Sequence, residues 1–119
     1  LHSQQRKNTL PDSLNHALEW ITRNLCNTTL SRGAIARHCG VSIRTLSRLF
    51  QAHMGMQATQ YIIHARLNQV RNMLAVPCLS VKEIAERCGF RNDGFMSRQF
   101  KQHYHVTPRE YRDTVCRLP

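Results

Sequence analysis

Residues 79–90 read LSVKEIAERCGF, and residues 30–41 read LSRGAIARHCGV. The two stretches share leucine, serine, isoleucine, alanine, cysteine and glycine at a constant offset of 49 residues. After one inserted residue the offset becomes 50, and three more positions recur: Ser47, Arg48 and Phe50 return as Ser97, Arg98 and Phe100. This repeat predicts two copies of one supersecondary unit.

Each copy carries the signals of a short helix, a turn at glycine and a longer helix. Ser80 and Glu83 form a capping box, so a helix is expected to begin at Val81. Gly89 is expected to end it in the left-handed conformation that glycine tolerates, and Asn92 to cap the next helix. In the first copy the same roles fall to Ser31, Gly40 and Ser42. This order of elements predicts a helix-turn-helix unit.

Further amphipathic helices support the two units. Residues 12–26 and 58–75 each place four apolar residues on one face: Leu14, Leu18, Ile21 and Leu25 in the first, and Ile63, Leu67, Val70 and Leu74 in the second. The second of these helices would span roughly 27 Å and is expected to hold two units apart rigidly. Thr107, Pro108 and Glu110 predict a last helix near residues 108–116.

The expected fold is therefore all-α, with two helix-turn-helix subdomains joined by a long linker helix, about seven helices and no strand. The expected segments are an N-terminal tail (1–11), a first subdomain (12–56), the linker helix (57–76) and a second subdomain (77–119). Because the chain begins with Leu1 and not with Met, we expect it to be a piece of a longer protein.

The charge balance favours a nucleic acid as the partner. Seventeen lysine and arginine residues face seven aspartate and glutamate residues, which gives a formal net charge of +10. Fourteen of the seventeen are arginine, whose planar guanidinium suits phosphates and guanine edges. The alternatives on charge alone are general solubility and attraction to an acidic membrane.

Other functional classes receive little support from the sequence. No stretch approaches the ~18 apolar residues of a membrane span. The odd number of cysteines, without a C-x-x-C pair, argues against a disulfide framework and favours the cytoplasm: Cys26, Cys39, Cys78, Cys88 and Cys116. The seven histidines are scattered, so neither a metal site nor a cofactor is expected. Without a catalytic constellation, an enzyme is not expected either.

Helical phase divides the longer helix of the first copy, from Ile43 to about His53, into two faces. The apolar face, expected in the core, holds Ile43, Leu46, Leu49 and Phe50. Arg44 and Arg48 stack four residues apart on the other face, which suits bidentate contact with guanine O6 and N7. The DNA-contacting residues expected here are Ser42, Arg44, Thr45, Ser47, Arg48 and Gln51. The alternative is an ordinary solvated face.

The same face of the second copy has a different composition. Its expected DNA-contacting residues are Asn92, Gly94, Phe95, Ser97, Arg98 and Lys101. Gly94 stands where Arg44 stands in the first copy, so one base-reading side chain is missing. Phe95 has two interpretations that the sequence leaves open, contact with a thymine methyl group or burial in the core.

These residues carry a resemblance to a known family. From about Leu14 to Arg112 the sequence resembles the DNA-binding domain of the AraC/XylS family of bacterial transcription regulators. In the second copy the resemblance rests on Ile84-Ala85, Cys88-Gly89-Phe90, Ser97-Arg98, Phe100-Lys101, Thr107-Pro108 and Tyr111-Arg112. In the first copy it rests on Ile35-Ala36, Gly40-Val41-Ser42, Leu46, Arg48-Leu49-Phe50, Gly55, Tyr61-Ile62 and Arg66-Leu67.

The resemblance implies a module that binds double-stranded DNA as a monomer and places the second helix of each unit in the major groove. It also implies activation of transcription through RNA polymerase, and a separate effector or dimerisation domain in many members. Three residues depart from the family pattern. Gln57 replaces a serine or threonine cap, His105 replaces a glycine that a positive φ would require, and Gly94 replaces a polar residue.

Two other functional hypotheses remain open. The first is the DNA-binding part of a transposase-like enzyme whose catalytic domain lies outside this chain. The second is a basic helical module for a protein or a membrane surface, which would require a wide exposed apolar stripe.

Overall fold

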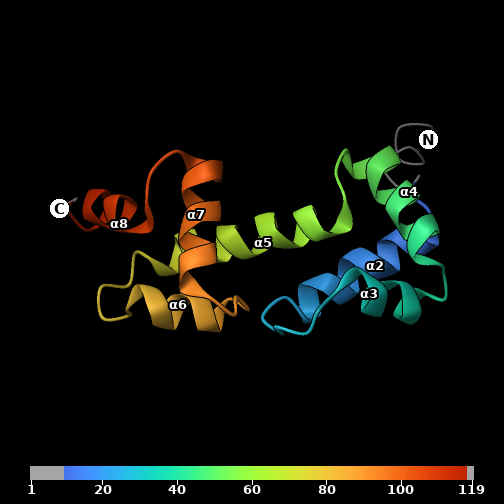
Figure 1. The fold of residues 1–119 in the computed structure, drawn as a ribbon, viewed down its shortest axis with the longest axis horizontal. Coiled ribbons are helices and arrows are strands. Elements are labelled where there is room, and N and C mark those ends of the chain that lie inside the picture. The colour runs from blue at the N-terminus through green and yellow to red at the C-terminus, as the bar shows by residue number, and fades with distance from the viewer. Residues whose placement is uncertain (1–9, 118–119) are drawn as a thin grey trace, which may run out of the picture. The chain divides into compact units, whose positions relative to one another are not determined.

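The computed structural model describes residues 10–117, so most of the tail expected over residues 1–11 lies outside the described part. Seven helices and no strand occur within residues 10–117, labelled as in Figure 1: α2 (Asp12–Arg23), α3 (Arg32–Cys39), α4 (Ile43–Met54), α5 (Ala58–Met73), α6 (Val81–Arg87), α7 (Asp93–Tyr104) and α8 (Pro108–Arg117). The prediction of an all-helical fold is confirmed.

The chain forms two compact units. Among residues 10–117, unit 1 contains residues 10–24 and 30–61, and unit 2 contains residues 25–29 and 62–117. The boundary along the chain falls inside α5, after Tyr61. The short segment 25–29 belongs to unit 2, although the helices before and after it in the sequence belong to unit 1.

The helix ends of unit 1 follow the expected capping chemistry. The Ser31 hydroxyl accepts a hydrogen bond from the Ala34 N–H at the start of α3, and the Ser42 hydroxyl accepts one from the Thr45 N–H at the start of α4. Gly40 ends α3 in the left-handed conformation, with φ 69°. Each of these residues satisfies backbone groups that a helix end leaves unpaired.

Helix α2 ends at Arg23, three residues earlier than residue 26 expected from its apolar pattern. The Asn24 side chain donates from Nδ2 to the Trp20 carbonyl oxygen at 2.9 Å, and the Asn24 backbone has left the helical region. Leu25 nevertheless stays buried, because segment 25–29 packs within unit 2. An apolar period therefore predicted the burial of Leu25 correctly and its helical conformation wrongly.

The core of unit 1 contains most of the apolar residues expected there. Leu14 and Ile21 of α2, Ile35 of α3, and Leu46 and Phe50 of α4 are almost completely buried. The expectation that Ile43 joins this core is wrong.

Ile43 is 44% exposed. It is the first residue of α4, so no preceding helical turn covers it. Its Cδ1 atom lies 3.9 Å from the point where a Cβ of Gly33 would be, and glycine supplies no side chain to bury it.

The core of unit 2 is built by the second part of α5 together with α6 and α7. Its buried residues are Leu67, Val70, Leu74, Ile84, Ala85, Cys88, Phe90, Met96 and Phe100. Tyr104 and Tyr111 pack against Phe100 at ring-centroid distances of 4.7 and 5.9 Å. Figure 1 shows α7 running across α6 and not alongside it, as expected for a helix-turn-helix unit.

Two capping boxes begin helices α6 and α8, as the sequence predicted. The Ser80 N–H donates to Glu83 Oε1 at 2.9 Å, and the Glu83 N–H donates to Ser80 Oγ at 3.0 Å. Thr107 and Glu110 exchange the same two bonds. The bond from the Ser80 backbone holds the pKa of the Glu83 carboxyl below its usual value.

His105 follows α7 in the left-handed conformation, with φ 69°. Among residues 10–117, His105 is the only residue other than glycine that has a positive φ. The position therefore has the backbone conformation for which the family pattern uses glycine, as expected from the sequence.

Segment 25–29 is held in unit 2 by Arg66. Its Nε donates to the Leu25 carbonyl oxygen at 2.8 Å, and its Nη2 donates to the Asn27 carbonyl oxygen at 2.7 Å. Arg66 is only 9% exposed, and burial lowers the pKa of its guanidinium. The group nevertheless remains charged, because arginine is not deprotonated in proteins.

Gly89 makes this close approach possible. A Cβ built on Gly89 would lie 2.7 Å from the Leu25 carbonyl oxygen and 2.9 Å from Arg66 Nε. Its φ of +91° also disfavours any residue with a side chain. The position thus excludes other residues for two independent reasons.

A substitution of Gly89 should separate these reasons. We expect Gly89→Ala to lower the free energy of unfolding by about 2–4 kcal/mol, because a clash with backbone adds to the unfavourable φ. In the matched variant Gly55→Ala the φ is +71° and nothing lies within 4 Å of the new Cβ. That variant should lose only about 1 kcal/mol. Urea unfolding of both variants is the measurement, and equal losses would contradict the steric argument.

Candidate DNA-binding surface

The outward face of α4 is basic and polar. Arg44, Arg48 and Gln51 are exposed, while Leu46 and Phe50 on the opposite side are fully buried. Because Arg44 and Arg48 lie one turn apart, their guanidinium groups project from the same face near the N-terminal end of the helix. The structure therefore places these three predicted residues on one solvent-exposed surface.

The other residues of this unit that were predicted to contact DNA are Ser42, Thr45 and Ser47. Thr45 and Ser47 are half-buried. The Ser42 hydroxyl donates to Thr45 Oγ1 at 2.9 Å, so both side chains belong to the cap of α4. Gln51 Oε1 accepts from Gln57 Nε2 at 2.9 Å, which fixes the Gln51 amide. The side chains of Ser42, Thr45 and Gln51 therefore have hydrogen-bond partners within the protein.

The outward face of α7 is also basic, with Arg98 and Lys101 exposed and Ser97 half-buried. Asn92 is exposed, and its Oδ1 accepts from the Phe95 N–H at 2.9 Å. Asn92 is therefore the N-cap that the sequence predicted, and its side chain fixes the first turn of α7.

Gly94 provides space for Arg98. A Cβ built on Gly94 would lie 3.6 Å from Arg98 Nη1 and 3.0 Å from Asn92 Oδ1. The Arg98 side chain thus runs back toward the N-terminus of α7, as helical side chains do, and its guanidinium lies over Gly94. In the first copy the matching position holds the side chain of Arg44. In the second copy it holds Gly94, and the guanidinium of Arg98 from the next turn lies close to it.

Phe95 projects from the same turn and remains 39% exposed. Its ring lies 6.3 Å from that of Phe90, which is almost fully buried. Of the two interpretations that the sequence left open, burial of Phe95 in the core is wrong. The ring rests on the core with one side and faces solvent with the other.

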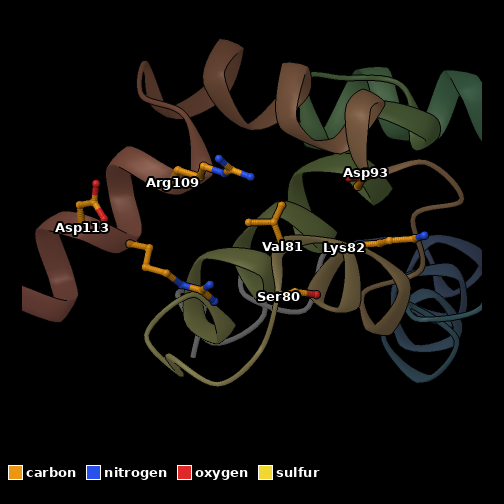
Figure 2. Close-up of a pocket in the computed structure, with 7 residues that line it drawn as sticks. Ser80, Val81, Lys82, Asp93, Arg109 and Asp113 are labelled. Atoms are coloured by element: carbon orange, nitrogen blue, oxygen red, sulfur yellow. The ribbon is translucent and has the colours of Figure 1, made fainter.

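Unit 2 also contains a cavity of about 510 Å³ at the starts of α6, α7 and α8. It is lined by Ser80, Val81, Lys82, Asp93, Arg109, Arg112 and Asp113. Figure 2 shows the Arg109 side chain extending from α8 across the side of the cavity where Val81 lies. The serine is engaged in the cap of α6, and three basic and two acidic side chains line the cavity. This composition is that of a charged hollow at the surface.

The two cysteines at matching repeat positions differ in burial. Cys88 is buried, its Sγ lies 3.5 Å from Met73 Sδ, and desolvation raises its pKa to about 11. Cys39 is only half-buried, and burial raises its pKa as well. Raised thiol pKa values disfavour the reactive thiolate, so packing explains both residues. Trp20 is half-buried, and its ring stacks on that of His38 at a centroid distance of 4.6 Å.

Further exposed residues lie on or beside α4 and α7 and were not among those predicted to contact DNA. Arg91 precedes the N-cap of α7, and Gln102 follows Arg98 by one turn on its outward face; both are exposed. The helical phase that selected Lys101 would have selected Gln102 too. Ile43 was not predicted to be exposed, because its helical phase assigns it to the core.

None of the helices within residues 10–117 is both long and apolar enough to cross a membrane. In the same part of the chain, no group of three or more histidine, cysteine, aspartate and glutamate side chains is arranged to hold a metal ion.

Comparison with known proteins assigns the chain to a family. The family described as "Helix-turn-helix domain" matches residues 35–114. The transcriptional activator RhaS of Salmonella arizonae is 31% identical over 106 residues, which cover 89% of this chain and 38% of RhaS. The chain spans only about a quarter to two fifths of the length of the curated relatives that it matches.

Solved structures agree with this assignment. A transcriptional regulator of Chromobacterium violaceum with an AraC-type DNA-binding domain is 31% identical, with a TM-score of 0.78 over 90% of this chain and 95% of that one. The DNA-binding domain of the transcription factor AdpA, solved in complex with a target DNA, is 28% identical, with a TM-score of 0.81 over 87% of this chain and 93% of that one. The chain therefore belongs to the AraC/XylS family of bacterial transcription regulators and contains the DNA-binding helix-turn-helix domain of that family.

Proposed function

We propose that this domain recognises a specific sequence of double-stranded DNA by inserting α4 and α7 into adjacent segments of the major groove. The observation that carries the proposal is the same in both units. A short helix and a glycine turn precede a capped helix whose outward face presents exposed arginine. An arginine on such a face can donate two parallel hydrogen bonds to guanine O6 and N7.

The two helices are expected to contribute unequally to base recognition. Helix α4 presents two exposed arginines, Arg44 and Arg48, one turn apart. Helix α7 presents one, Arg98, because Gly94 takes the position of the second. Hydrogen-bonded reading of bases therefore falls mainly to α4, while Arg98 and Lys101 supply charge to the second segment.

We further propose that the domain acts in activation of transcription, in the cytoplasm, with RNA polymerase as a protein partner. The support is the relative RhaS, which is described as a transcriptional activator. A net charge of +10 supplies the non-specific attraction that delivers such a domain to DNA. The AdpA domain, whose fold is similar, was solved with a target DNA. The transposase-like alternative has no observation in its favour.

Substitution of single arginines should reveal the inequality. We expect Arg44→Ala or Arg48→Ala to weaken binding to the cognate site and to relax its specificity at one or two base pairs. The loss per bidentate contact should be about 1–3 kcal/mol. Arg98→Ala should weaken binding to cognate and scrambled duplexes more equally. Affinities for both duplexes at one fixed salt concentration are the measurement.

Arg37→Ala is the matched control, because it removes an exposed arginine of unit 1 that lies outside the recognition helix. It should not change the ratio of cognate to scrambled affinity. If Arg98→Ala abolished discrimination while Arg44→Ala and Arg48→Ala preserved it, the roles of α4 and α7 would be reversed.

The length and symmetry of the bound site give a second test. Two recognition helices in adjacent major-groove segments contact DNA about one turn apart, so one chain should protect an asymmetric site of roughly 20 base pairs. The site is obtained by selection from a random pool, and its length by nuclease footprinting. Stoichiometry follows from light scattering of the complex. A site of half this length, or a palindrome that binds two chains, would contradict the proposed mode of binding.

A further inference from the structure

We propose that Phe95 reads the C5 methyl group of a thymine in the DNA segment that α7 contacts. The proposal rests on the proposed function, since it requires α7 to enter the major groove. It assigns to the second recognition helix an apolar contact with a base in place of the second arginine of the first helix.

The position of Phe95 is fixed from two sides. Its N–H donates to Asn92 Oδ1 at 2.9 Å, so the residue belongs to the capped first turn of α7. Its ring lies beside that of Phe90, tilted by 52° at a centroid distance of 6.3 Å. An aromatic side chain has few rotamers, and a neighbouring ring reduces them further. The neighbouring ring therefore restricts the orientations that the exposed part of Phe95 can adopt before a ligand binds.

The surroundings of the ring indicate what it would contact. Arg91 precedes the helix, Arg98 follows Phe95 by one turn, and both are exposed. Phe95 and Arg91 also line a hollow of about 250 Å³, together with Ile63 and Phe90. An apolar ring among cations is poorly suited to a membrane or to a large protein interface, which would need a contiguous apolar patch.

The major groove offers a chemical match for this arrangement. Cationic side chains attract the phosphates, and the thymine methyl is the apolar group that the four bases present in that groove. A ring 39% exposed at the first turn of a recognition helix has the surface needed to cover one methyl group. The chemistry of the site thus selects thymine.

Gly94 adds no side chain of its own beside the ring. It precedes Phe95 in the turn and has no side chain, and the Arg98 guanidinium lies over its backbone. In the first copy the two matching positions hold Arg44 and Thr45, and Thr45 is half-buried and bonded to Ser42. The first helix therefore has no apolar side chain at the position of Phe95.

Replacement of thymine by uracil tests the contact directly, because it removes only the methyl group. In the selected duplex, each thymine on both strands is replaced in turn by deoxyuridine, and affinities are measured at one salt concentration. At one position the unsubstituted protein should lose about fourfold in affinity, the factor expected for one buried methyl group. Phe95→Ala should bind the thymine and uracil duplexes at that position equally well.

Further variants separate the contact from folding and from other residues. Phe95→Gln keeps the length of the side chain and should likewise lose the preference for thymine, whereas Phe95→Leu should keep part of it. Arg37→Ala, which removes an exposed residue outside α4 and α7, should leave the preference unchanged. Thermal unfolding of each variant shows whether it is folded at the temperature of the binding assay.

The possible outcomes distinguish this inference from the proposed function. A selected site in which no thymine is sensitive to uracil overturns the role of Phe95 but leaves sequence-specific binding intact. The same holds if the sensitivity persists in both Phe95→Ala and Phe95→Gln. If the unsubstituted protein prefers no sequence at all, the proposed function fails and this inference fails with it.

Discussion

The hydrogen bonds from Arg66 to the carbonyl oxygens of Leu25 and Asn27 attach segment 25–29 to unit 2. A buried charge is costly unless its donors are satisfied, and two bonds of 2.7–2.8 Å meet this requirement. They hold segment 25–29 directly against Gly89, where a side chain would collide with backbone. Gly89 in turn begins the connection to Asn92, the cap of α7. The connection that leads into α7 therefore begins beside two carbonyl groups that are far from it in the sequence.

A second arginine makes the same pair of bonds elsewhere in unit 2. Arg112 of α8 donates from Nε to the Leu74 carbonyl oxygen and from Nη2 to that of Val76. Those carbonyls lie 49 residues after Leu25 and Asn27, which is the offset of the repeat. The arginines do not follow the repeat. After the inserted residue the offset of the repeat is 50, and this offset relates Arg112 to Ile62 and not to Arg66. Arg66 lies one helical turn beyond Ile62, so the clamp is repeated in space although its residue is not repeated in sequence.

This difference shows what could be predicted from the sequence and why. Caps and glycine stops were predictable, because Ser80 with Glu83, or Gly40 after Cys39, acts within a few residues of its partner. The role of Arg66 was not, because its partners are backbone carbonyls about 40 residues away, which carry no residue-specific signal. The exposure of Ile43, the first residue of α4, was not predictable for a related reason. Helical phase gives Ile43 a direction, but only a neighbour such as Gly33 decides whether that direction is covered.

The divergence of the two recognition helices has a physical consequence for a single chain. Two identical helices would read the same bases twice, and a repeated site could be bound in more than one register. Here Arg44 and Thr45 of α4 correspond to Gly94 and Phe95 of α7, so the two helices offer different chemistry to the groove. Hydrogen-bonding arginines favour guanine, whereas an apolar ring favours thymine. On the proposed mode of binding, an asymmetric site then fixes one orientation of the domain on DNA without a second chain. On the proposed role in activation, a single orientation presents the same surface of the domain to RNA polymerase at each site.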